Sequence, residues 1–264
     1  MSGNVYASAP SFLYSLPVTS CTAYSGYSNY QCHSDTATTA PWSGIIDGYG
    51  ISGYPFSSTY FNDAAIEYYE PTPPATNTCN TDSAIFWAGL GGVNVSGLAQ
   101  DGTLMGVCGA TDGSFWFEML PDETGMVVPY PAYIVAAGDT MWAQLYYVNS
   151  TTMAIYMKDV TTGAVYDPEI TVTTSVYDGA TAEAIAERPS ISNTPVDLED
   201  YGTLSVIWDY ATGGSTDLET SSRLWNFLNT TMYNGSDELS YVSTLPVQAQ
   251  SEDGSFVTTW LSSS

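Results

Sequence analysis

Three glutamates and one glutamine stand in stretches of the sequence that are otherwise small or apolar. They are Gln100 in SGLAQDG, Glu118 in SFWFEMLP, and Glu183 and Glu187 in ATAEAIAER. Polar side chains among apolar neighbours cost stability unless they find partners, so these residues are candidates for chemistry. A carboxyl group can take or give a proton, and a side-chain amide can donate hydrogen bonds to developing negative charge. We therefore expect Gln100 and Glu187 to meet in the folded chain.

Short strands are the elements that must hold these side chains. Residues two and four apart in a strand point to the same face. Glu183 and Glu187 therefore share one face of the segment 182–187, and three alanines occupy the other. By the same period, Trp116 lies on the same face as Glu118.

The rest of the chain has the pattern of an all-β protein. We count more than ten short apolar segments, separated by turn signals about every 8–12 residues, which is typical of a sandwich or barrel. Gly138-Asp139 and Thr162-Gly163 have hairpin chemistry, and only residues 219–230 hint at a helix. The pattern predicts a two-sheet antiparallel β-sandwich.

The domain organisation follows from where this pattern begins. Residues 1–41 are rich in Tyr, Ser, Thr and Ala without clear periodicity, and we expect an irregular N-terminal extension. No linker divides residues 42–264, which we expect to form one β-sandwich domain.

Charge excludes several classes of partner. The chain has 28 acidic residues against three Lys and Arg, for a formal charge of −25. Phosphate binding needs clustered basic residues, so nucleic acid and anionic membranes are unlikely partners. Because bases are so few, protonating every carboxylate would leave a net charge of only about +5. The composition therefore fits an acidic environment, with self-repulsion increasing toward neutral pH.

The cysteines and sequons fit a secreted chain. Four cysteines allow three pairings, of which we favour Cys21 with Cys32 and Cys79 with Cys108. Because the chain has a single His, a structural zinc site is not expected, and we expect no other metal or cofactor. Glycosylation sequons begin at Asn94, Asn149, Asn229 and Asn234.

Six short motifs, in this order, resemble the glutamic peptidases, also called eqolisins. They are WAGLGG (87–92), LAQDG (98–102), DGSFWFEMLP (112–121), AAGDT (136–140), DVTTG (159–163) and AEAIAE (182–187). The similarity extends over roughly residues 42–210, starting at Trp42. The chain differs at Gly91, Ser114 and Arg188, where the family has acidic residues.

The resemblance implies a secreted, acid-active endopeptidase on a two-sheet sandwich of the concanavalin type. It matches the family's catalytic Gln and Glu to Gln100 and Glu187. It implies substrate-binding or supporting roles for Trp42, Trp87, Trp116, Glu118 and Glu183. The implied partner is a polypeptide substrate, and we expect a monomer.

The chemistry of such a pair is plausible in acid. Glu187 as a carboxylate could remove a proton from water and then return it to the leaving amine, while Gln100 could hold the oxyanion. A glutamate stays partly ionised near pH 3–4, where a histidine base would be fully protonated.

Two other classes of function share this composition and fold. A β-sandwich lectin or surface glycoprotein would have no need of Gln100 and Glu187 together. A glycoside hydrolase would need two neighbouring carboxyl groups. Glu183 and Glu187 are four residues apart on one strand, or about 13 Å between Cα atoms, which makes them a poor acid and base couple.

Overall fold

The computed structural model describes residues 5–6, 20–23, 30–39, 41–47, 61–72, 82–92, 97–106, 113–121, 123–128, 133–149, 151–172, 179, 181–191, 194–213, 227–244 and 255–262. These residues form strands, turns and irregular segments, and none of them is helical. Within these ranges there is accordingly no helix long and apolar enough to cross a membrane.

The strands are short and follow one another along the described chain. They are β1 (Val5–Tyr6), β2 (Ser20–Ala23), β3 (Tyr30–Thr39), β4 (Trp42–Asp47), β5 (Phe61–Tyr69), β6 (Ala84–Gly91), β7 (Leu98–Met105), β8 (Gly113–Leu120), β9 (Glu123–Val127), β10 (Ile134–Val135), β11 (Thr140–Asn149), β12 (Thr152–Asp159), β13 (Val165–Tyr166), β14 (Glu169–Thr171), β15 (Ala182–Glu187), β16 (Ser190–Ile191), β17 (Thr194–Pro195), β18 (Thr203–Gly213), β19 (Phe227–Asn234), β20 (Asp237–Thr244) and β21 (Phe256–Trp260).

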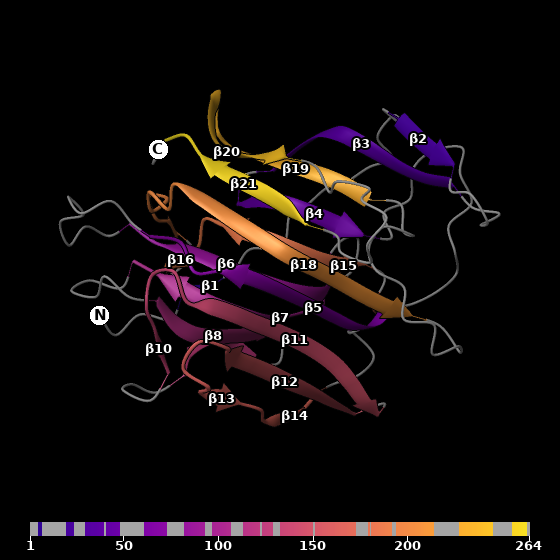
Figure 1. Cartoon of the computed structure of the whole chain (residues 1–264), viewed down its shortest axis with the longest axis vertical. Coiled ribbons are helices and arrows are strands. Elements are labelled where there is room, and N and C mark those ends of the chain that lie inside the picture. Colours follow the sequence, from indigo (N-terminus) through magenta and orange to yellow (C-terminus); the bar gives the residue numbers. More distant parts are fainter. Residues whose placement is uncertain are drawn as a thin grey trace.

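The large sheet is curled so that two layers of strands face each other (Figure 1). One layer runs β3–β19–β4–β15–β6–β7–β8, with β9 and β10 beyond β8. The other runs β21–β18–β5–β11–β12, with β13 and β14 beyond β12. Strand β20 pairs with both β19 and β21 and so joins the layers at one edge. The predicted antiparallel β-sandwich is confirmed, although β3 and β19 run parallel.

The hydrophobic core fills the space between the two layers. Strand β15 turns its three alanines toward this core, as its alternation predicts. Large core side chains come from both layers, and they include Phe86, Phe115, Phe117, Tyr68, Leu145, Ile155 and Val206. Because successive side chains of a strand point to opposite faces, the face of β15 that carries the glutamates points away from the core.

Two segments are more regular than the sequence suggests. Residues 1–41 were expected to be irregular, but their described parts form β1, β2 and β3, and β3 extends the sheet beside β19. Within the segment 219–230, where a helix was hinted at, residues from Phe227 onward belong to β19. Its Thr-Thr pair is β-branched and suits a strand packed between two neighbours. The division of the chain at residue 41 stays a prediction.

The cysteine pairing also stays a prediction. Strand β2 places Cys21 directly opposite Cys32 of β3. Opposed residues of an antiparallel pair lie about 4.5–5.5 Å apart, which is within the range of a disulfide. Cys79 and Cys108 lie outside the described residues.

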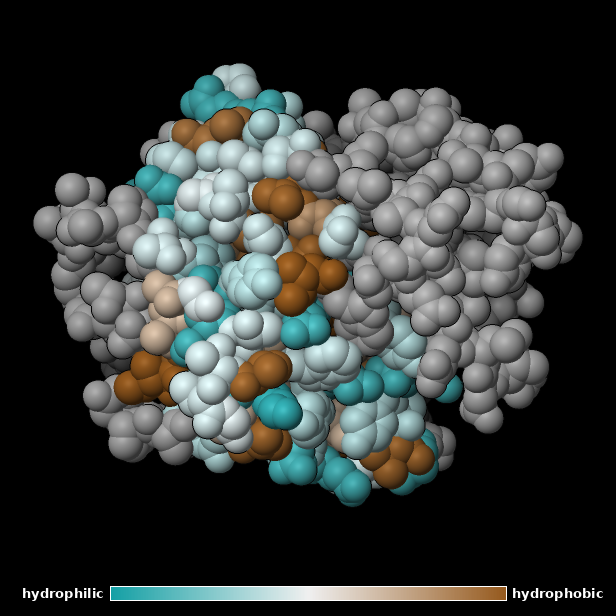
Figure 2. Space-filling model, in the orientation of Figure 1, coloured by the Kyte–Doolittle hydropathy of each residue, from teal (hydrophilic) through white to brown (hydrophobic). Residues whose placement is uncertain are grey.

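Among the residues coloured in Figure 2, most of the strongly apolar ones lie in small groups set among more hydrophilic ones. The large exposed apolar side chains of the described chain are Tyr69, Tyr146, Val148, Val160, Val165 and Leu261. Of the sequons, Asn149 and Asn234 are exposed, whereas Asn229 is only 8% exposed. A glycan at Asn229 would therefore not fit this fold, and Asn94 lies outside the described residues.

A buried acid, Glu70, lies at the end of β5 in the core between the layers. Thr103 donates a hydrogen bond to Glu70 Oε2 (2.7 Å), and the hydroxyl groups of Tyr68 and Thr103 are 2.8 Å apart. Since Thr103 has one proton to give, Tyr68 must donate to Thr103. The pKa of Glu70 is raised to about 8, chiefly by burial. The hydrogen bond from Thr103 opposes this rise, and the charges of Asp139 and Asp159 contribute to it.

This buried group should make the protein less stable as the pH rises. The folded state keeps the Glu70 proton up to pH about 8, while the unfolded chain releases it near the ordinary value of 4.5. The folded state binds more protons in this interval, so the free energy of unfolding falls as the pH rises through it. One pKa unit corresponds to about 1.4 kcal/mol, so the loss from this group is several kcal/mol.

Urea unfolding between pH 3 and 9 measures the effect. Glu70→Gln should make the decline between pH 4.5 and 8 shallower, whereas the exposed Glu169→Gln should leave it unchanged. A parent protein whose stability rises steadily from pH 4 to 8 contradicts the prediction.

Candidate active site

The candidate residues lie on one face of the layer β4–β15–β6–β7–β8. Directly opposed residues of antiparallel strands share a face. One row across the strands is Glu183–Gly89–Gln100–Glu118, the next is Ile185–Trp87–Gly102–Trp116, and a third contains Trp42–Glu187–Ile85. The register agrees with the two same-face pairs expected from the period of two, Glu183 with Glu187 and Trp116 with Glu118.

Gln100 is held by Glu118, its neighbour on β8. Nε2 of Gln100 donates a hydrogen bond of 2.7 Å to Oε2 of Glu118, and both side chains are fully buried. Oε1 of Gln100 has no hydrogen-bond partner among the described residues. One amide hydrogen and the amide oxygen of Gln100 are thus not used by the Glu118 bond.

Glu187 is held by Trp87, its diagonal neighbour on β6. The indole Nε1 of Trp87 donates a hydrogen bond of 2.8 Å to Oε2 of Glu187. Trp42 packs edge-on against Trp87, with 5.1 Å between the ring centroids and 78° between the ring planes. This packing fixes the indole ring and, through it, the carboxyl group of Glu187.

The register separates Gln100 from Glu187 within the shared face. Gln100 lies level with Glu183, while Glu187 lies level with Leu104, four residues further along β7. From the spacings of strands and residues, Cα of Gln100 is about 10 Å from that of Glu183 and about 16 Å from that of Glu187. The register thus does not favour direct contact between Gln100 and Glu187. That the two side chains bind one shared water stays a prediction.

Two glycines make room for the large side chains of this face. A Cβ at Gly89 would lie 2.4 Å from the Trp87 ring and 3.2 Å from Oε2 of Glu183. A Cβ at Gly102 would lie 1.9 Å from the carbonyl oxygen of Phe86. Gly89 therefore provides the space over which the carboxyl group of Glu183 lies, and Gly102 allows β6 and β7 to pair closely.

The segment LAQDG is part of a strand rather than a turn. Residues 98–102 lie inside β7, which pairs with β6 on one side and β8 on the other. Asp101 is fully buried on the opposite face from Gln100, and burial raises the pKa of its carboxyl group well above its usual range. Asp-Gly normally favours a turn, but here pairing on both edges of β7 overrides that preference.

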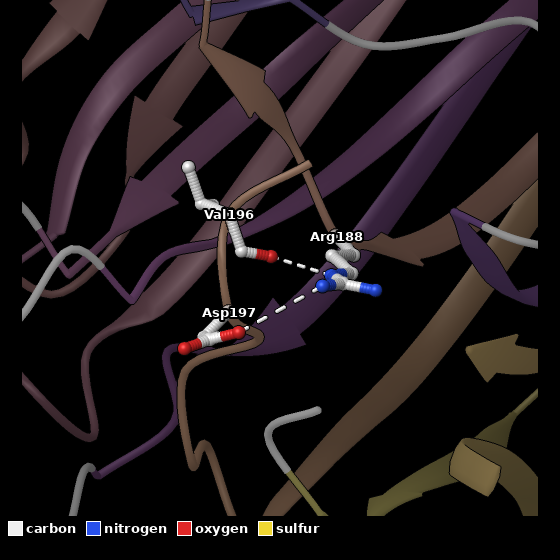
Figure 3. Close-up of polar contacts among 3 residues, drawn as sticks. All are labelled: Arg188, Val196 and Asp197. Atoms are coloured by element: carbon white, nitrogen blue, oxygen red, sulfur yellow. Dashed lines mark hydrogen bonds and ion pairs between the residues drawn. The ribbon is translucent and has the colours of Figure 1, made fainter. Parts of the chain in front are cut away.

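The structure places all three positions that differ from the family, Gly91, Ser114 and Arg188. Arg188 points away from the site: its Nε donates to the carbonyl oxygen of Val196, and Nη2 lies 3.8 Å from Oδ1 of Asp197 (Figure 3). Burial lowers the pKa of Arg188, and the Asp197 charge opposes this shift. Gly91 has a φ of 87°, a conformation that strains any residue with a side chain. Ser114 lies at the start of β8, in the row of Leu104.

The fold is similar to that of several solved peptidases. Similar solved structures include scytalido-glutamic peptidase with a transition state analog inhibitor, which is 13% identical with a TM-score of 0.59 over 84% of this chain and 98% of that one. SCP-B of the eqolisin family, in complex with the tripeptide Ala-Ile-His, is 12% identical with a TM-score of 0.58 over 84% and 98%. Aspergilloglutamic peptidase from Aspergillus niger is 18% identical with a TM-score of 0.54 over 68% and 99%. At these identities the likeness shows the β-sandwich fold of glutamic peptidases.

The family itself is shown by the sequence match. The model of the Peptidase A4 family matches residues 49–250, and the chain belongs to this family. A search of curated proteins found no match. The chain is therefore a hydrolase of the glutamic peptidase type, as the six motifs indicate, and its substrate is a polypeptide.

The bond between Trp87 and Glu187 can be tested against a matched tryptophan. Trp87→Phe should lower the free energy of unfolding by about 1–3 kcal/mol more than Trp116→Phe, because it leaves a buried acceptor unsatisfied. Both changes remove the same volume from a fully buried site, but Nε1 of Trp116 has no partner among the described residues. Urea unfolding at pH 4 gives the two values, and equal losses would show that the bond contributes nothing.

Proposed function

We propose that the chain is a secreted endopeptidase that works in acid through Gln100 and Glu187. The proposal is supported above all by the buried face on which these two side chains lie, each with a bonded partner of its own. Bonded partners hold a catalytic group in one geometry before the substrate arrives, which lowers the activation barrier. A lectin or surface glycoprotein does not need such an arrangement.

The proposed reaction divides the work between the two residues. The Glu187 carboxylate takes a proton from water as the water oxygen attacks the carbonyl carbon of the scissile bond. The amide hydrogen of Gln100 that is not bonded to Glu118 donates to the oxyanion that forms. Glu187 then gives its proton to the leaving nitrogen, the C–N bond breaks, and a carboxylic acid and an amine are released. Glu187 is thereby returned to its carboxylate form.

Acid suits both the chemistry and the fold. An amide keeps its donors at every pH, whereas a histidine base would be fully protonated in acid. The buried Glu70 and Asp101, whose pKa values are raised by burial, remain protonated there. The four cysteines and the exposed sequons at Asn149 and Asn234 support secretion. The proposed reaction uses neither a metal nor a cofactor, and we propose a monomer.

Cleavage of denatured casein between pH 2 and 5, with a pepsin inhibitor present, tests the proposal. Gln100→Ala should lower kcat by about 10²–10³-fold if its amide stabilises the oxyanion. Glu187→Gln should abolish turnover because no group remains to move the proton.

The controls are changes of the same type outside this face. Gln144→Ala removes a glutamine that bonds to Asp63 on β5, and Glu169→Gln changes an exposed glutamate. Both should keep the parental activity. Equal digestion by all five proteins would remove Gln100 and Glu187 from the mechanism, and no digestion by the parent would remove the acid endopeptidase itself.

A further inference from the structure

We propose that Glu183 is a positioning residue of the peptidase site. As a protonated carboxyl group it donates a hydrogen bond directly to Oε1 of Gln100 and so fixes the orientation of the amide. This inference rests on the proposed role of Gln100 in catalysis.

Glu183 and Gln100 are neighbours on the site face. The two residues lie in one row, separated only by Gly89 of β6. Oε2 of Glu183 lies 3.2 Å from the place where a Cβ on Gly89 would stand, so the carboxyl group extends over β6. The Cα atoms of Glu183 and Gln100 are about 10 Å apart, a gap that two long side chains leaning toward each other can close.

The amide oxygen of Gln100 accepts no hydrogen bond from a described residue. Glu118 accepts from Nε2 on one side, whereas Oε1 is buried and accepts no bond from a described residue. A buried acceptor without a donor costs about 1–3 kcal/mol. A protonated carboxyl group is a donor, and Glu183, which is 3% exposed, lies in the same row.

The protonation state of Glu183 therefore decides which way the amide points. An ionised Glu183 offers only acceptors, so it would favour the flipped amide with Nε2 toward β15. That flip would replace the bond from Gln100 to Glu118 with two acceptors facing each other. The protonated form keeps Nε2 on Glu118 and leaves its second hydrogen for the oxyanion.

The other titratable groups on this face are few. Strand β8 adds Glu118 and β15 itself adds Glu187. Over their described lengths, β4, β6 and β7 place no titratable side chain on this face. Both neighbours are acids, so their charge favours the protonated form of Glu183.

Steady-state kinetics from pH 2 to 6, with a quenched peptide substrate, separate positioning from mere structure. Glu183→Ala removes the donor and should lower kcat at pH 3 by about 10–100-fold, the usual cost of a supporting partner, with little change in KM. Glu183→Gln supplies a donor that does not titrate, so it should keep most of kcat at pH 3. Its kcat should also persist to higher pH than in the parent. Glu169→Ala is the matched control on the surface.

The outcomes decide the matter. An unchanged kcat in Glu183→Ala overturns the proposal, and so does an equal loss in Glu183→Ala and Glu183→Gln at every pH. The second result would mean that the carboxyl group matters for folding rather than for the amide.

A second measurement does not depend on activity. The chain has five glutamines, so ¹⁵N-glutamine labelling gives few side-chain amide signals, and Gln100→Ala identifies the one from Gln100. In the parent this signal should shift as Glu183 titrates, and Glu183→Gln should remove that step. An identical titration in both proteins overturns the inference, even if the parent cleaves no peptide in acid.

Discussion

The pairing of β15 on both of its edges is the constraint on which the site depends. With β4 on one side and β6 on the other, the strand cannot slip by one residue without moving its alanines out of the core and its glutamates into it. The same register carries across β6 to β7 and β8, so the rows of the site and the packing of the core are set by one set of backbone hydrogen bonds. A change in core packing that shifts this register would therefore change the geometry of the site.

Glycine and alanine on these strands have opposite but linked uses. On the core face, the alanines of β15 and the absence of a side chain at Gly113 leave room for the large side chains of the second layer and for Glu70, whose Oε1 would lie 2.3 Å from a Cβ at residue 113. On the site face, Gly89 and Gly102 leave room for Trp87 and Glu183 and for close pairing. Small residues thus allow bulky aromatic and acidic side chains to be buried on both faces of a thin sheet.

The sequence was sufficient for the architecture and for the faces, because both follow from the period of two in short strands. The alternation in 182–187 placed Glu183 and Glu187 on one side, and the turn at Thr162-Gly163 correctly predicted that β12 pairs with β13. It was not sufficient for the register, because the partners of β15 lie between 92 (Ala182 with Leu90) and 145 (Glu187 with Trp42) positions away, and so it could not show that Glu183 rather than Glu187 lies level with Gln100. The local preference of Asp-Gly for a turn is also overridden, because tertiary pairing makes residues 98–102 a strand. The sequence did not indicate that Glu70 is buried, because an acidic residue before a proline-rich segment is typical of a surface.

The preference for acid follows from the site as well as from the composition. Glu118, Glu183 and Glu187 are at most 3% exposed and share one face, to which β4, β6, β7, β8 and β15 contribute no Lys, Arg or His in their described parts. Ionising all three would bury like charges without a cation to offset them, which costs far more than ionising one. A face built in this way works when it holds protons on some of its carboxyl groups. The neutral amide of Gln100 then has both a donor and an acceptor to bond with, whereas ionised Glu118 and Glu183 would offer it acceptors alone. The arrangement that makes the amide useful for catalysis is thus the arrangement that ties it to acid.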